Sequence, residues 1–96
     1  MSTPVSTAET EPHIRVVTVE APPVNALTVR SWFDLAAAIT SAGTDPDCHV
    51  VVLRAEGRGF NAGVDIKEIE ASEGYAALIG ANHGCAAAFS AVYDCA

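Results

Sequence analysis

Apolar segments along the chain are separated by turn-forming residues, and their spacing predicts a strand, a helix and a second strand in that order. His13–Glu20 is rich in β-branched residues, and the two prolines that follow end a strand. Thr28 can cap a helix that ends near Gly43, with an apolar stripe at Val29, Trp32, Phe33, Ala36 and Ile39. His49–Arg54 is a short apolar run, typical of a central strand covered on both faces. This order indicates a βαβ unit and an α/β fold.

Two further helices are predicted in the C-terminal half. The segment Asp65–Ala71 begins with the Asp-x-x-Glu spacing that resembles a capping box, which favours a short helix. A longer helix is expected over Glu73–Asp94, with helical spacing at Tyr75, Leu78, Ile79, Asn82, Cys85, Ala86, Phe89, Val92 and Tyr93. Gly80 and Gly84 each weaken that helix by roughly 1 kcal/mol relative to alanine. We expect close approach of another helix at these glycines to compensate.

The N-terminal segment and the overall composition restrict the class of protein. Residues 1–12 are rich in Ser, Thr and Pro and lack the features of a secretory signal, so we expect a disordered tail on a cytoplasmic protein, before one domain or part of one at 13–96. The net charge of −7 disfavours nucleic acid as a partner. The apolar runs, such as Leu35–Ile39, are too short to cross a membrane. The three cysteines and three histidines lack the spacing of metal ligands or of a disulfide framework.

The loop after the second strand has the composition of an anion site. Ala55–Val64 holds three glycines within seven positions and leads into the short helix. Unpaired N–H groups and the helix dipole at such a place can hold a phosphate or a developing oxyanion. Three of the five basic residues, Arg54, Arg58 and Lys67, lie in this part of an acidic chain. The alternative is a flexible connection with solvated charges.

Two segments resemble a known family. Gly59–Glu68 closely resembles the crotonase-family (enoyl-CoA hydratase/isomerase) motif, in which an aromatic and a small or polar residue precede Ala-Gly-x-Asp-(Ile/Leu). Pro22–Leu27 resembles the family's early Pro-x-x-Asn-Ala-Leu segment, about forty residues before. The resemblance spans His13–Ala96 and implies an incomplete N-terminal part of the crotonase (ClpP-like) ββα spiral fold.

This resemblance implies a site for an acyl-CoA thioester, with no cofactor except the coenzyme A of the substrate itself. The N–H of Val64 would be the first of two backbone donors in an oxyanion hole that stabilises an enolate. Val24 and Ala26 would line the coenzyme A groove, and the backbone at Ala62 would meet the adenine. Lys67 would approach a phosphate of coenzyme A.

Other parts of the family's site are expected to lie beyond this chain. In the family a strand, a Gly-rich turn with the second donor, and the acid/base carboxylates follow the long helix, so the chain alone is expected to be inactive. Asp65 is interpreted as a helix cap, and Glu68, Glu70 and Glu73 as solvated. Full-length relatives assemble as homotrimers or hexamers, with much of the contact made by the C-terminal part.

The reaction stays open between several hypotheses. Hydration or isomerisation of an enoyl-CoA, in fatty-acid or steroid breakdown, is the default of the family. The sequence Phe60–Asp65 resembles the same motif in actinobacterial relatives that degrade steroid-derived CoA thioesters. A ring-opening C–C hydrolase is therefore one alternative. A non-catalytic CoA-binding fragment is another. A dinucleotide-binding module is a rival, but the glycines at 57, 59 and 63 depart from G-x-G-x-x-G and no acid lies at the ribose position.

Overall fold

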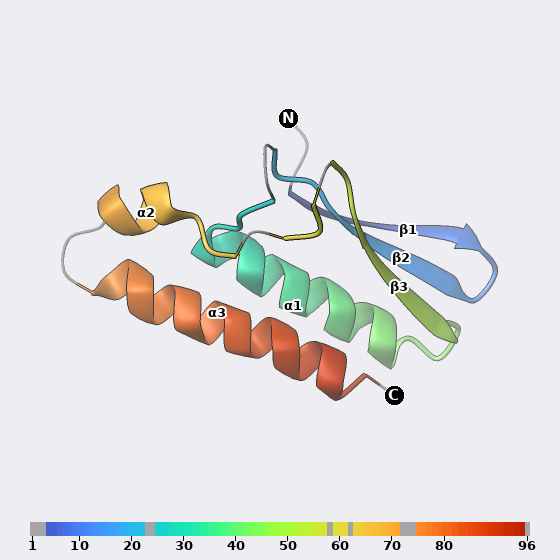
Figure 1. Ribbon diagram of the computed structural model, residues 1–96. Helices are drawn as coiled ribbons and strands as arrows, with labels where there is room; N and C mark the ends of the chain where they lie inside the picture. Colours follow the sequence, from blue (N-terminus) through green and yellow to red (C-terminus); the bar gives the residue numbers. More distant parts are fainter. Residues whose placement is uncertain (1–3, 23–24, 58, 62, 72–74, 96) are drawn as a thin grey trace.

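A computed structural model describes residues 4–22, 25–57, 59–61, 63–71 and 75–95. Its elements, in chain order, are β1 (Val5–Glu11), β2 (Ile14–Val19), α1 (Val29–Thr44), β3 (Val50–Ala55), α2 (Ile66–Ala71) and α3 (Ala76–Tyr93). Over these residues the strands form one sheet in the order β1-β2-β3. Helix α1 packs on this sheet, α3 lies beside α1, and the short α2 lies beyond the sheet (Figure 1). The predicted α/β fold is confirmed.

The βαβ unit forms as predicted. Strands β2 and β3 pair in parallel, from Ile14 opposite Val50 to Val19 opposite Ala55, and α1 connects them. Thr28 caps α1, because its side-chain oxygen accepts a hydrogen bond from Ser31 N at 3.2 Å.

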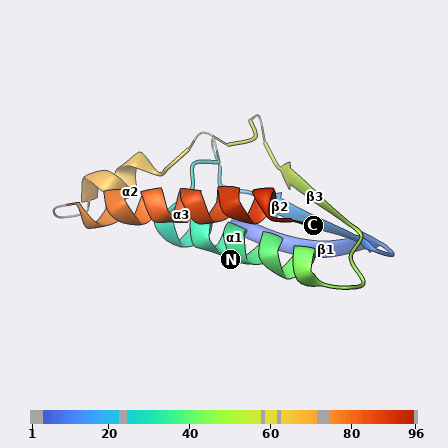
Figure 2. The ribbon, with the colours of Figure 1, turned by 90° about the horizontal axis from the view of Figure 1, so that it is seen from below.

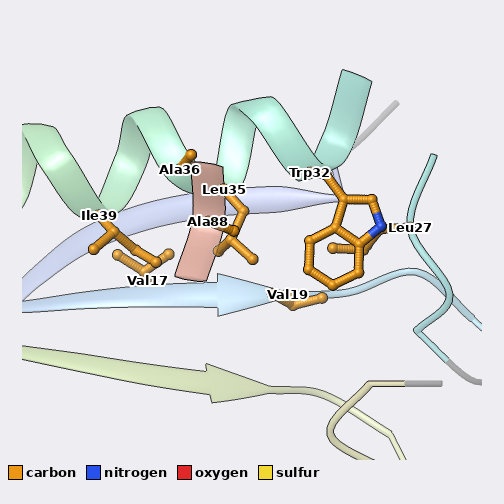
Figure 3. Packing of buried hydrophobic residues seen from close by; sticks show 8 residues of the cluster. All are labelled: Val17, Val19, Leu27, Trp32, Leu35, Ala36, Ile39 and Ala88. Carbon is orange, nitrogen blue, oxygen red and sulfur yellow. The ribbon is translucent and has the colours of Figure 1, made fainter. Parts of the chain in front are cut away.

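The core lies between α1 and β2. Trp32, Leu35 and Ile39 on α1 point toward Val17 and Val19 on β2, with Ala88 of α3 against them (Figure 3). The predicted stripe named half of the buried α1 residues and missed Ser31, Leu35 and Ala42. It also included Phe33, which is 44% exposed. A buried stripe a little more than 100° wide takes in neighbours that a strict spacing misses.

The expected tail at 1–12 is wrong for Val5–Glu11, which forms β1. This strand pairs antiparallel with β2, from Val5 opposite Val19 to Glu11 opposite Ile14. Its side chains are almost all exposed, so it needs backbone pairing rather than an apolar sequence. Pro12 and His13 make the turn between the strands, with His13 at φ 71°. Proline before a residue with positive φ favours such a turn, so Pro12 belongs to the β1–β2 hairpin and not to a tail.

Strand β3 differs from the central strand that its composition predicts. It lies at an edge of the sheet, and its side chains alternate between exposed and half-buried positions. Val50 is 51% and Val52 is 41% exposed. Among the described helices only α1 packs on the sheet, and it lies on one face, so the second apolar face of β3 lies open.

Helix α3 packs through its small residues. Ala81, Gly84 and Ala88 are buried, whereas large residues of the predicted stripe, Leu78, Ile79, Phe89, Val92 and Tyr93, are more than half exposed. The predicted close approach at glycines is confirmed, because a Cβ on Gly84 would lie 2.8 Å from Trp32 Cβ. The view from below shows α3 beside α1 and running in the same general direction (Figure 2). Among the helices of the described residues, none combines the length and apolar character needed to cross a membrane.

Candidate functional site

A backbone bridge joins the two segments that carry the resemblance. Leu27 N donates to Gly63 O at 2.9 Å, and Asp65 N donates to Leu27 O at 3.0 Å. These bonds form a parallel bridge between Leu27 and Val64. Leu27 is 1% exposed, so the bridge is anchored in the core. Residues about forty positions apart in the sequence therefore meet beside the start of α2.

The bridge fixes the direction of the Val64 amide. The Gly63 C=O and the Val64 N–H belong to one planar trans peptide and point in opposite directions. Because Leu27 N holds the carbonyl, the Val64 N–H faces away from Leu27. It donates no hydrogen bond within the described part of the chain. Gly63 has φ 104°, which side chains rarely adopt, so glycine permits this peptide orientation.

An open apolar groove lies between Val64 and α3. Its volume is about 820 Å³. Besides Val64 it is lined by Leu78, Ile79, Ala81, Asn82, His83, Cys85, Ala86 and Phe89. Burial raises the pKa of the Cys85 thiol, so this side chain stays a neutral thiol near pH 7. The cysteines at 48, 85 and 95 are free, and Cys95 is exposed.

A buried asparagine holds the loops of the site together. Asn25 is 3% exposed and has φ 59°. Its Oδ1 accepts from Ala21 N at 2.7 Å, and its Nδ2 donates to Glu56 O at 2.7 Å and to Gly59 O at 2.8 Å. Asn25 is not among the predicted site residues, although asparagine is among the residues that most readily adopt positive φ.

The start of α2 is capped as predicted. Asp65 Oδ1 accepts from Glu68 N at 3.2 Å, which supports the interpretation of Asp65 as a helix cap. The expectation that Glu68 is solvated is wrong. Its side chain is half-buried, and Oε1 accepts from Val29 N at 2.8 Å. The first N–H groups of α1 have no partner within the helix and attract negative charge, so Glu68 ties α2 to α1. Glu70 is exposed, and Glu73 lies outside the described residues.

Replacing Glu68 with alanine should lower the free energy of unfolding by about 1 kcal/mol, the typical value of an N-terminal helix cap. The measurement is urea unfolding followed by circular dichroism. Glu70→Ala is the matched control on the same helix, and its exposed side chain should give a change of at most about 0.5 kcal/mol. An equal fall in the free energy of unfolding in the two variants would contradict a stabilising bond between Glu68 and Val29 N.

The predicted basic cluster is not assembled by the described residues. Arg54 pairs with Glu56, so its charge is partly compensated at the end of β3. Lys67 is exposed on α2, which stands apart from β3 in both views (Figures 1 and 2). Arg58 lies outside the described residues. Of the two described residues, Arg54 has an ion pair, and Lys67 is an exposed cation with none in the described structure.

The remaining predicted site residues are only partly described. Ala26 is half-buried and directly precedes the bridge residue Leu27. Val24 and Ala62 lie outside the described residues. The structure thus brings together Ala26, Val64 and the start of α2.

Comparison with known proteins agrees with this geometry. The family described as enoyl-CoA hydratase/isomerase matches residues 9–96. A Rhodococcus jostii protein, named (7aS)-7a-methyl-1,5-dioxo-2,3,5,6,7,7a-hexahydro-1H-indene-carboxyl-CoA hydrolase, is 69% identical over 83 residues, 86% of this chain and 32% of that protein. A Mycobacterium tuberculosis protein of the same name is 60% identical over 93 residues, 97% of this chain and 38% of that protein. The chain thus spans about a third of the length of these relatives.

Solved structures show the same fold. An enoyl-CoA hydratase/carnithine racemase from Magnetospirillum magneticum is 28% identical, with a TM-score of 0.82 over 99% of this chain and 36% of that one. An enoyl-CoA hydratase from Bacillus anthracis, 20% identical, superposes with a TM-score of 0.85 over 97% of this chain and 36% of that one. The described elements correspond to the N-terminal third of crotonase-fold structures. With the family match over residues 9–96, the chain belongs to the enoyl-CoA hydratase/isomerase, or crotonase, family.

Proposed function

We propose that this chain forms part of a ring-opening hydrolase that acts on a bicyclic, steroid-derived CoA thioester. The observation that carries the proposal is the identity of 69% over 83 residues to the Rhodococcus jostii indene-carboxyl-CoA hydrolase. Relatives named probable enoyl-CoA hydratase are more distant, at 36% identity over 61 residues in Bacillus subtilis and 40% over 63 in Mycobacterium tuberculosis. The degree of identity favours hydrolysis over hydration.

The role proposed for Val64 is to donate its N–H to the thioester oxygen. Its amide donates no hydrogen bond to the described residues, and the bridge to Leu27 holds its peptide plane. A ring opens when the oxygen of water bonds to a ring ketone carbon and the adjacent C–C bond breaks. The electron pair of that bond is delocalised toward the thioester oxygen as an enolate, and a proton then returns to carbon. A fixed donor at that oxygen stabilises the charge as it forms.

Other contacts with the substrate are proposed for the same region. Val24 and Ala26 would line the groove for coenzyme A, and the backbone at Ala62 would meet the adenine. Exposed Lys67, without an ion pair in the described structure, would approach a phosphate. The second oxyanion donor and the acid/base residues would come from the part of the relatives' length that this chain does not span. Assembly as a homotrimer or hexamer would depend on that part as well.

The experiment uses a chimera in which this chain replaces the matching segment of the Rhodococcus jostii relative. We expect the chimera to keep the activity of that relative on the indene-carboxyl-CoA thioester within about tenfold, because most residues of the segment are identical. Mass spectrometry should find a product that has gained one water and still carries coenzyme A. A thiol reagent measures any free coenzyme A, which simple thioester hydrolysis would release.

Two outcomes decide between the hypotheses. A folded chimera that hydrates an unbranched enoyl-CoA such as crotonyl-CoA, and leaves the indene thioester intact, would overturn the hydrolase proposal in favour of a hydratase. A folded chimera that binds coenzyme A but converts neither thioester would favour a non-catalytic CoA-binding role for this chain.

A further inference from the structure

We propose that Asn61 and Asn25 are positioning residues that aim the Val64 N–H at the thioester oxygen. The Asn61 side chain donates to the backbone carbonyl of Asn25, whose own side chain bonds the neighbouring loops, and we call the two residues the asparagine clip. The inference rests on the proposed function, because it assigns a purpose to residues that do not themselves reach the thioester. Its contacts are all made by described residues.

The first half of the clip holds Gly63. Asn61 Oδ1 accepts from Gly63 N at 2.9 Å, and Leu27 N donates to Gly63 O at 2.9 Å. Both polar groups of Gly63 are therefore held, one by a side chain and one by the buried bridge. Since the Val64 N–H shares a peptide plane with the Gly63 carbonyl, fixing Gly63 on both sides fixes the direction of that N–H.

The second half anchors Asn61. Its Nδ2 donates to Asn25 O at 2.6 Å. Asn25 is held in turn by three side-chain hydrogen bonds, to Ala21 N, Glu56 O and Gly59 O. Because Asn25 is buried, its carbonyl is a fixed reference point to which the exposed Asn61 attaches.

Among the described residues, hydrogen bonds hold the glycine loop. A Cβ built on Gly57, Gly59 or Gly63 would meet no atom within 4 Å there, so these positions offer no side-chain packing. Glu56 N donates to Val19 O at 2.9 Å, and the clip adds hydrogen bonds at Glu56, Gly59 and Gly63. The bridge to Leu27 still holds the Gly63 carbonyl when a clip contact is lost, so the Gly63–Val64 peptide should shift rather than turn freely. Misplacement by about 1 Å can lower a rate by up to about 100-fold.

The test is Asn61→Asp in the chimera with the Rhodococcus jostii relative. Aspartate has nearly the same shape and still accepts from Gly63 N, but it cannot donate to Asn25 O. Asn61 is exposed and loses one hydrogen bond, so this variant should melt only a few degrees below its parent, whereas Asn25 variants risk unfolding a buried site. We expect kcat for the indene thioester to fall about tenfold, with KM changed less than about twofold, because alignment rather than binding is lost.

A double-mutant cycle with Val64→Pro distinguishes an effect of Asn61 through the Val64 N–H from an independent effect of Asn61 on kcat. If the clip acts through the Val64 N–H, Asn61→Asp should lower kcat no further once that N–H has been removed. Multiplicative losses, or an Asn61→Asp kcat within about twofold of the parent, would overturn the clip. If Val64→Pro itself leaves kcat unchanged, or the folded parent chimera is inactive, the proposed function fails, and the clip inference falls with it.

Discussion

Replacing Val64 with proline in the chimera should lower kcat for the indene thioester by about 10²- to 10³-fold, which is the usual effect of removing one oxyanion donor. Proline has no N–H, so it deletes the proposed donor directly. The hydrogen bonds of the bridge use the Gly63 carbonyl and the Asp65 N–H, and both remain. The substitution should therefore lower kcat while the Leu27–Val64 bridge remains formed.

Val64→Ala is the matched control for this substitution. It keeps the N–H and removes side-chain packing, since Val64 is half-buried against the core cluster. We expect a loss of stability of about 1 to 2 kcal/mol, with kcat within about threefold of the parent. Initial rates and thermal melts of both variants make the comparison. Equal loss of kcat in the alanine and proline variants would refute the donor role of the Val64 amide.

Local signals predicted most of the secondary structure because each rests on a few neighbouring residues. Thr28 and Asp65 cap helices as their spacing indicates. The βαβ order forms because the β-branched runs of β2 and β3 flank a helical apolar stripe. The family resemblance added the expectation that the loops after β2 and β3 contribute to one site, and the Leu27–Val64 bridge joins them.

The faces of the elements were harder to predict than their existence. Periodicity names the apolar residues of α3, but it does not say which neighbour covers them. In the described structure α1 takes the face of small residues, because these let two helices approach closely, and Phe89 and Tyr93 are left exposed. Strand β1 could not be predicted from periodicity at all, because an exposed edge strand carries no apolar pattern.

The asparagine clip was also beyond local prediction. Asn61 and Asn25 are 36 positions apart, and their contact depends on how two loops without regular structure fold against each other. Glu68 is similar, because its partner Val29 N lies 39 positions away. Polar contacts of this kind leave no periodic signal. The asparagine in the Pro-x-x-Asn-Ala-Leu segment was the available clue, since it stands where the chain has positive φ.

Replacing Gly84 with valine should lower the free energy of unfolding by about 3 kcal/mol, at the upper end of the usual cost of overpacking. An added Cβ would lie 2.8 Å from Trp32 Cβ and 3.5 Å from the ring of Phe33. Trp32 Cβ is bonded to the backbone and cannot rotate away, so α1 and α3 would have to separate. Gly80 is less restrictive, because its nearest contact is a methyl group of Val29 at 3.1 Å.

Ala86→Val is the matched control for this second substitution. Ala86 is exposed on the same helix, two positions away, so it takes on the same β-branched side chain without the clash. Its cost should be only the lower helix propensity of valine, below about 1 kcal/mol. Urea unfolding of both variants, followed by circular dichroism, gives the two free energies. If the free energy of unfolding falls no more in Gly84→Val than in Ala86→Val, the helices α1 and α3 can separate at little cost. The face of small residues would then not determine how these helices pack.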